Sequence, residues 1–213
     1  MGLTGLAMAT VRALLGPGAN NELISQLFYP VGFIAVIIGR AQLFTENTLY
    51  PVVLVLEDSR HIPNLLRLWG VVFATNVFGS MLFALLMTKT SALEPKVVET
   101  LAGLGSNIAA QAFARVLWSG VIGGWLIALV AWMVTASHWT VGQILVIWLL
   151  AFVVGVGHFS HCIASSGEIW CGVFAGAVSV KQYFGWLLPA TVGNIIGGVT
   201  IVSLLNWGQV RAD

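Results

Sequence analysis

The sequence predicts an all-α membrane protein with about six membrane-spanning helices, two of which are interrupted near their middle. The chain has 213 residues, of which 58% are hydrophobic and only 8% are charged. Soluble domains carry about 25% charged residues, so the apolar surface of this chain is expected to face lipid. A spanning helix needs about 20 mainly apolar residues, and the length therefore allows about six. Two of the hydrophobic runs contain polar segments, which predict the interruptions.

The hydrophobic runs follow one another with short polar connections. We expect them at 2–15, 25–56 with an interruption, 65–87, 112–134, 141–180 with an interruption, and 183–207. The first run covers only about 22 Å, which predicts that this helix is incomplete at its N-terminus or that residues precede it. Between the third and fourth runs, a short surface helix is expected after Pro95, because proline suits the first turn of a helix.

The two polar interruptions predict a packed interior or a pore. They are GRAQLFTENT at 39–48 and GHFSHCIASSGE at 157–168. Irregular backbone at membrane depth is tolerated only where protein buries it or where it lines a wet cavity. In the second interruption, Ser165 and Glu168 have the spacing of a capping box, so Glu168 is interpreted mainly as a helix cap. Two helix N-termini that point to the middle of the protein favour an anion over a cation.

The third and sixth runs share an N-x-x-G pattern, at Asn76 and at Asn194. Each pattern follows its interruption at a similar distance along the chain. Two halves with three spans each must run in opposite directions, which is the plan of an inverted repeat. We therefore expect one transmembrane domain over 1–213, with repeat 1 at about 1–88 and repeat 2 at about 112–207.

Several polar residues in the interruptions are candidates for function. His161 is an ionisable residue at membrane depth, where such residues are costly and usually functional. The alternative is a neutral, hydrogen-bonded structural histidine, and the same alternative holds for His158. Arg40 and Glu46 flank the first interruption, where they either gate a vestibule or form an ion pair that holds the loop. Asn47 is a candidate cap or brace of the same loop.

Composition excludes other classes of function. The net charge of +1 argues against a nucleic acid partner and leaves no polybasic anchor for lipid headgroups. Cys162 and Cys171 lie outside any CxxC pattern, so we expect no disulfide, no metal site and no cofactor. The histidines belong to no recognisable catalytic arrangement with a serine, cysteine or carboxylate nucleophile, so we expect no enzymatic activity. The positive-inside rule does not decide the orientation, because basic residues lie on both predicted sides.

Three motifs resemble those of the formate/nitrite transporter family, and the resemblance covers nearly the whole chain. That family has an L-F-T-G-N-T-like loop, a G-F-E-H-S-x-A-N-like segment and a P-x-x-x-G-N-I-x-G-G pattern. The matching stretches here are LFTENT at 43–48, HFSHCIAS at 158–165, and Pro189 with GNIIGG at 193–198. The stretches RAQLFTENT and RLWGVV are most similar to the YfdC-like branch of the family.

The resemblance implies an aquaporin-like fold, a homopentamer with one pore in each protomer, and a bacterial-type inner membrane with cytoplasmic termini. It also implies transport of small monovalent anions, often with a proton. By position, His161 matches the central pore histidine and Thr45 matches the threonine that faces it. The residues that match the two apolar constrictions are Leu43, Phe44 and Ile127 for one, and Tyr29, Phe33 and Val154 for the other. Such constrictions disfavour a bare anion through desolvation.

This sequence departs from the family pattern around the site, which puts the usual substrates in question. The departures are Glu46 for a glycine, Gly124 and Ser165 for asparagines, Ser160 for a glutamate, and Val154 for a phenylalanine. Two other functions stay open. One is a passive channel for small neutral solutes, although the paired NPA loops of aquaporins are absent. The other is a non-conducting scaffold or regulator, which a continuous apolar plug without a vestibule would favour.

Overall fold

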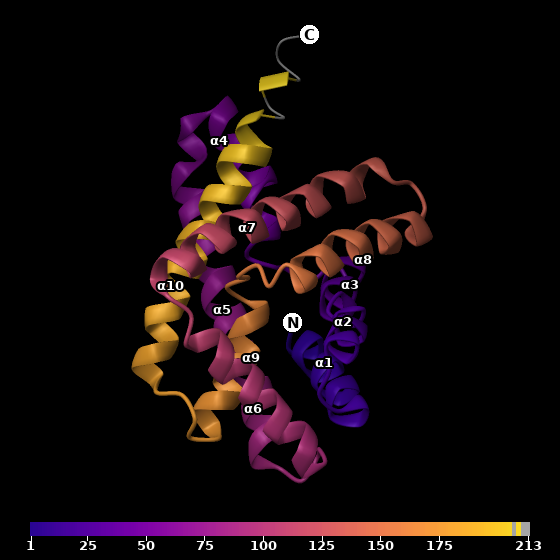
Figure 1. Cartoon of the computed structure of the whole chain (residues 1–213). Coiled ribbons are helices and arrows are strands. Elements are labelled where there is room, and N and C mark those ends of the chain that lie inside the picture. Colours follow the sequence, from indigo (N-terminus) through magenta and orange to yellow (C-terminus); the bar gives the residue numbers. More distant parts are fainter. Residues whose placement is uncertain (206–207, 210–213) are drawn as a thin grey trace.

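The described part of the chain, residues 1–205 and 208–209 of the computed structural model, is helical and contains no strand. The long helices and their interruptions follow the expected order (Figure 1). The helices are α1 (Gly2–Leu15), α2 (Ala19–Gln26), α3 (Val31–Ile38), α4 (Tyr50–Glu57), α5 (Ile62–Lys89), α6 (Pro95–Ala109), α7 (Phe113–Ala136), α8 (Thr140–Val156), α9 (Ala164–Phe174) and α10 (Val180–Ile196). Short 3₁₀ turns lie at Glu46–Thr48 and Ser59–His61, and a π-helical segment, Gly197–Leu204, continues α10.

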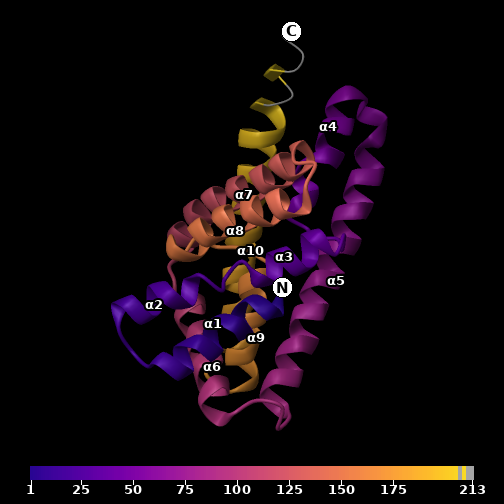
Figure 2. The same cartoon turned by 90° about the vertical axis from the view of Figure 1, so that its right-hand side faces the viewer.

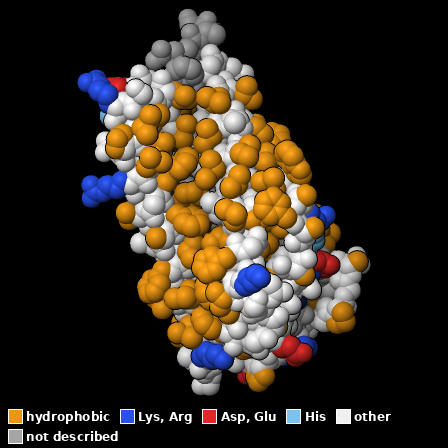
Figure 3. All heavy atoms as spheres, turned by 90° about the vertical axis from the view of Figure 1, so that its left-hand side faces the viewer, with side chains coloured by type: hydrophobic (Ala, Val, Ile, Leu, Met, Phe, Trp, Pro, Cys, Tyr) orange, Lys and Arg blue, Asp and Glu red, His pale blue; other side chains and the backbone are white. Residues whose placement is uncertain are grey.

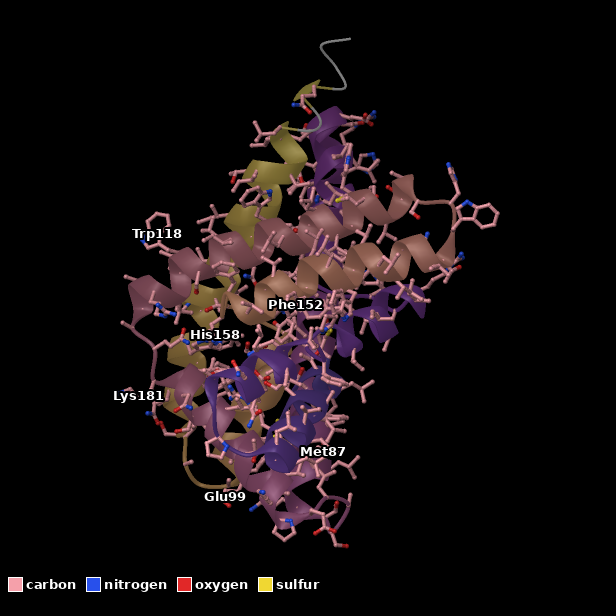
Figure 4. All side chains as sticks on the ribbon, turned by 45° about the vertical axis from the view of Figure 1, so that its right-hand side comes forward. Met87, Glu99, Trp118, Phe152, His158 and Lys181 are labelled. Carbon is pink, nitrogen blue, oxygen red and sulfur yellow. The ribbon has the colours of Figure 1, made fainter. Side chains whose placement is uncertain are left out.

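Four helical segments of the described chain are long and apolar enough to cross a membrane. They are Ala19–Ile38, Ser59–Lys89, Phe113–Ala136 and Val180–Leu204, and two shorter apolar helices are α1 and α8. Figure 3 shows hydrophobic side chains over the middle of one face, with most charged side chains near its ends and rim. Trp118, on α7, is 66% exposed and extends away from the ribbons in Figure 4. An apolar surface of this kind fits lipid and protein neighbours.

Several predicted boundaries need correction. The second run begins at Ala19, because α2 precedes the turn before Pro30, and the predicted start near 25 is too late. Helix α9 begins at Ala164, so the predicted restart at Ile169 is also too late. The polar residues at the start of α9 suggested a loop, but they are buried inside the protein. The sixth run begins at Val180, and its predicted end at Trp207 lies outside the described residues.

Helix α6 begins at Pro95 as expected, and one of its faces is packed against the protein. It contacts α1 and α9, and it buries Leu101, Ala102 and Gly105. At Gly105 the backbone of α6 meets the backbone of Glu168 and Ile169 so closely that a Cβ has no room. Small residues allow helices to approach in this way when no hydrophobic effect drives them together. The other face of α6, with Lys96, Glu99 and Gly103, is exposed.

Helices α7 and α8 form an antiparallel hairpin that crosses the other helices (Figures 1 and 2). Helix α7 also packs closely along α10 and its π-helical continuation. At Gly193 and Gly197 a Cβ would collide with backbone atoms of α7, and at Gly124 it would collide with the backbone of Asn194. These glycines therefore keep α10 in direct contact with α7, as the small-residue pattern indicates.

The close approach at Gly105 predicts that substitution by alanine costs more stability there than at Gly103, a nearby glycine of α6. Gly105→Ala should lower the free energy of unfolding by about 1–3 kcal/mol, because α6 and α9 must separate to admit the methyl group. Gly103→Ala is the matched control, because nothing lies within 4 Å of its added Cβ. Thermal unfolding of the purified protein in detergent measures both. Equal melting temperatures for the two variants would contradict this packing.

Candidate pore site

The first interruption is a loop fixed by a side chain of α5. Helix α3 ends at Ile38, and Arg40 turns the chain with a φ of 52°. Asn76 then holds the loop, because its Oδ1 accepts from the Phe44 N–H at 3.0 Å and its Nδ2 donates to the Gln42 carbonyl at 3.0 Å. The loop therefore has its backbone groups paired with protein, as membrane depth requires.

The second interruption is built in the same way. Helix α8 ends at Val156, and His158 turns the chain with a φ of 51°. Asn194 accepts from the Cys162 N–H at 2.8 Å and donates to the Ser160 and Gly120 carbonyls, each at 2.8 Å. Each asparagine lies 32 residues after the amide that it accepts from and 34 after the loop carbonyl that it donates to. This equal spacing is the internal repeat, and the N-x-x-G asparagines are its common element.

Thr45 and His161 meet between the two interruptions. Thr45 Oγ1 and His161 Nε2 are 2.8 Å apart, and both residues are fully buried. His161 Nδ1 accepts from the Ala164 N–H at 3.0 Å, so the imidazole also caps the first turn of α9. Because Nδ1 accepts, the proton of a neutral imidazole lies on Nε2, which donates to Thr45. The hydroxyl proton of Thr45 is then available to another acceptor.

Aromatic and aliphatic side chains surround this pair. The ring of Phe33 meets the His161 ring edge to face, with centroids 5.0 Å apart, and the Tyr29 ring lies 5.4 Å from Phe33. Phe44 packs edge to face against Phe73 and Trp69 of α5. Leu43, Ile127 and Val154 are buried in the same hydrophobic cluster. An ion at His161 is therefore separated from water by apolar groups.

A cavity of about 130 Å³, called the vestibule below, lies next to the site. Tyr29 and Val154 line it, together with Ser165 and Glu168 of α9. Its outer part is charged, because Arg12 and Glu22 form an ion pair there. His158 also lines it, at the end of α8 (Figure 4). The structure thus has a cavity with charged and polar residues in its wall, next to the buried residues Tyr29 and Val154.

Comparison with known proteins decides the family. The family model "Formate/nitrite transporter" matches residues 1–208. The chain belongs to the formate/nitrite transporter family. It is 31% identical to "Inner membrane protein YfdC" of Escherichia coli (strain K12), over all of this chain and 69% of that protein. It is 28% identical to "Probable formate transporter" of Methanothermobacter thermautotrophicus, over 90% of this chain and 76% of that protein.

Solved structures of formate/nitrite transporters share the fold. "FNT family ion channel" superposes with a TM-score of 0.82 at 19% identity, over 98% of this chain and 87% of that one. "Pentameric formate channel with formate bound" gives a TM-score of 0.80 at 19% identity, over 100% of this chain and 94% of that one. The chain is therefore an integral membrane protein with the channel fold of this family, with two broken helices in an inverted repeat.

Other predicted residues of the first interruption have contacts that differ from those expected. No ion pair joins Arg40 and Glu46 in the described residues, and Arg40 is exposed at its left-handed turn. The loop is held by neutral groups, so that expectation of an ion pair is wrong. Asn47 donates to the Gln42 side chain at 3.0 Å and to the Leu43 carbonyl at 2.9 Å, and its own carbonyl accepts from Trp69. Asn47 thus supports the loop together with Asn76.

The capping box predicted in the second interruption is absent. Helix α9 begins two residues earlier than that box requires, at Ala164, and Ile163 is its N-terminal flanking residue. Ser165 and Glu168 are therefore residues of the helix itself. His161 satisfies the first amide in place of a serine. Glu168 is 3% exposed and lies at the vestibule, where it has no capping role.

Sequence reasoning missed the roles of both asparagines, although it noted their pattern as a repeat. Each asparagine lies on a different helix from the interruption that it binds, so nothing in the neighbouring sequence indicates these hydrogen bonds. It also missed that Ser160, which stands where the family has a glutamate, pairs with Ser119 of α7 at 2.8 Å. The described residues contain no group of three His, Cys, Asp or Glu side chains that could hold a metal ion.

Removal of the Asn194 side chain should destabilise the protein more than removal of the Asn76 side chain. Asn194→Ala leaves two carbonyls and one amide without partners, and each lost buried bond costs about 1–3 kcal/mol. Asn76→Ala removes two bonds at a more exposed loop and is the matched comparison. Hydrogen exchange should increase over 157–163 in the first variant and over 39–48 in the second. Exchange that rises equally in both loops for either variant would contradict separate clamps.

Proposed function

We propose that this chain forms a channel or transporter for small monovalent weak-acid anions of the formate and nitrite type, linked to protons. The family and the names of its relatives support this class of function. The buried contact between Thr45 and His161, between two broken helices and beside a vestibule, is the observation that carries the proposal. In this proposal, the pair is where a passing anion finds its hydrogen-bond donors.

The proposed path has a polar centre between two apolar constrictions. An anion enters from the vestibule and passes Tyr29, Phe33 and Val154. It then meets the Thr45–His161 pair and leaves past Leu43, Phe44 and Ile127. An unpaired anion in an apolar passage costs several kcal/mol in lost hydration. A neutral weak acid of the same size avoids most of that cost, which is why we link the passage to a proton.

The chemistry of His161 sets a condition on this linkage. A second proton on the imidazole must go to Nδ1, which then has to release the Ala164 N–H. A bare imidazolium among apolar rings is disfavoured, whereas an anion bound at Nε2 offsets that cost. We therefore infer that protonation of His161 accompanies the arrival of an anion and does not precede it. The free hydroxyl proton of Thr45 gives the anion a second donor.

The same proposal covers assembly and orientation. We propose a homopentamer with one pore in each protomer, in a bacterial-type inner membrane and with a cytoplasmic C-terminus. The pentameric structural relative supports the assembly, and the YfdC relative supports the membrane. Within the single transmembrane domain, repeat 1 covers α1 to α5 and repeat 2 begins with α7. The proposal includes no enzymatic reaction and no cofactor.

Two alternatives remain testable beside this proposal. A passive channel for small neutral solutes also needs hydrogen-bonding groups, which Thr45 and a neutral His161 supply. A scaffold without conduction needs no chamber, and the vestibule next to Tyr29 and Val154 argues against it. Transport of formate, nitrite, hydrosulfide, lactate and glycerol separates these alternatives.

The central pair predicts a defined loss of transport. In proteoliposomes, His161→Phe should reduce anion flux to the level of empty vesicles, and Thr45→Val should lower it about tenfold, because each removes a donor to a charged group. Thr75→Val is the matched control, since the Thr75 hydroxyl bonds only within α5 in the described structure. Size-exclusion chromatography should give one elution volume for all four proteins. Undiminished flux through His161→Phe would remove this histidine from the mechanism.

A further inference from the structure

The vestibule contains one carboxyl group that its neighbours leave without a partner. Arg12 pairs with Glu22 at the outer part of the cavity, and Arg12 Nε also donates to Ser25 at 3.2 Å. His158 Nε2 lies 3.7 Å from the Glu22 carboxylate. Glu22 thus has two basic neighbours. Glu168, from α9, lines the same cavity and forms no ion pair in the described residues.

Glu168 is buried more deeply than any other carboxyl group that lines the vestibule. It is 3% exposed, and its Oε1 has no hydrogen-bond partner among the described residues. Helix α1 contacts it through Gly5, where an added Cβ would lie 2.8 Å from Glu168 Cγ. An ionised carboxylate in such a place costs far more than a protonated one, so burial favours the acid form of Glu168.

Glu168 lies close to the start of the proposed path. The vestibule that it lines is also lined by Tyr29 and Val154, which form the first apolar constriction together with Phe33. Glu168 therefore shares a cavity with two residues of that constriction. Arg12 lines the same cavity. An anion attracted to this guanidinium arrives close to a protonated carboxyl group.

We propose that Glu168 is a proton-carrying residue of the vestibule, which transfers its proton to the weak-acid anion before the anion enters the constriction at Tyr29, Phe33 and Val154. This inference rests on the proposed transport function. In the step, the O–H bond of the Glu168 carboxylic acid breaks and a bond from that proton to the anion forms. The neutral acid crosses the constriction, and at the central pair its proton passes to Nδ1 of His161, which releases the Ala164 N–H, so that the imidazolium and the anion form there together. The carboxylate that remains next to Arg12 then takes a proton from water in the vestibule.

The other titratable groups around Glu168 are few. Arg12 faces it from α1, Glu22 from α2, Tyr29 from the turn before α3, and His158 from the second interruption. Helix α6 contributes the amide of Asn107 to the cavity wall and no charged group, and Gln111 lines the cavity just after the end of α6.

Two further elements pack against α9. On α10, Tyr183 bonds to Ser166 at 3.0 Å, and on α5 the charged residues are Arg67 and Lys89, near its ends. Cys171 lies on α9 itself, about one turn after Glu168. Glu22 and His158 are therefore the groups whose titration must be separated from that of Glu168.

Transport measured against pH tests the inference. Wild-type protein in vesicles should carry formate faster at about pH 5.5 than at about pH 7.5, with internal acidification that matches formate uptake. Glu168→Gln should lower the flux about tenfold at the lower pH and flatten the pH profile, because the amide fills the same space but donates no transferable proton. Glu168→Asp should restore part of the profile. Glu99→Gln, an exposed glutamate of α6, is the control and should behave as wild type.

The outcomes distinguish this inference from the proposed function. Normal wild-type flux with an unchanged profile in Glu168→Gln would overturn the role of Glu168 alone. A profile that is flattened by Glu22→Gln or His158→Gln, and not by Glu168→Gln, would overturn it as well. Absence of flux from well-folded wild-type protein would contradict the proposed function and this role with it.

Infrared difference spectra provide a readout that does not need transport. Addition of formate should reduce the band of a protonated carboxyl group in wild type. The same change should be absent from Glu168→Gln. A band change of equal size in both proteins would also overturn the assignment.

Discussion

The hydrogen bond between Thr45 and His161 depends on one constraint, which is that backbone groups at membrane depth need partners inside the protein. Two helices stop in the middle of the chain's apolar region, and each exposes amides and carbonyls there. Asn76 and Asn194 satisfy those groups from neighbouring helices, with the same spacing in the two halves. With both interruptions fixed in this way, a threonine from one half reaches a histidine from the other. The repeat thus supplies two rigid loops and one polar centre.

The polar centre, which is the Thr45–His161 pair, and the vestibule contain different kinds of polar group. The interior has neutral donors, whereas the charged residues Arg12 and Glu22 are at the outer part of the vestibule and are paired there. Glu168 lies between these regions and is buried without a partner. Charged groups thus lie at the outer part of the vestibule, Glu168 can hold a proton further in, and neutral donors lie at Thr45 and His161. This arrangement suits a weak acid that is neutralised before it crosses the apolar constrictions.

The sequence predicted the helical class and the order of the spans, because long apolar runs report on them directly. The resemblance of the loop motifs to those of the family implied that Thr45 faces His161, and the two residues are in contact. It did not predict that α6 is packed, since burial of a moderately polar helix depends on neighbours distant in sequence. It placed the start of α9 too late, because Ser165 and Glu168 have the composition of a loop although protein covers them. The expected ion pair of Arg40 and Glu46 failed for a related reason: neutral side chains already held the loop.

The central claim is that His161 is neutral until the weak acid arrives, and that it then takes the proton and holds the anion. Nitrogen NMR of histidine-labelled protein in bilayers tests this most directly, since the chain has only four histidines and His161→Gln assigns the signal. Without an anion, the account predicts a neutral imidazole with its proton on Nε2. Formate at about pH 5.5 should shift that signal toward the imidazolium form, with a cross-peak to labelled formate carbon. A His161 signal that is unchanged by formate would contradict the account.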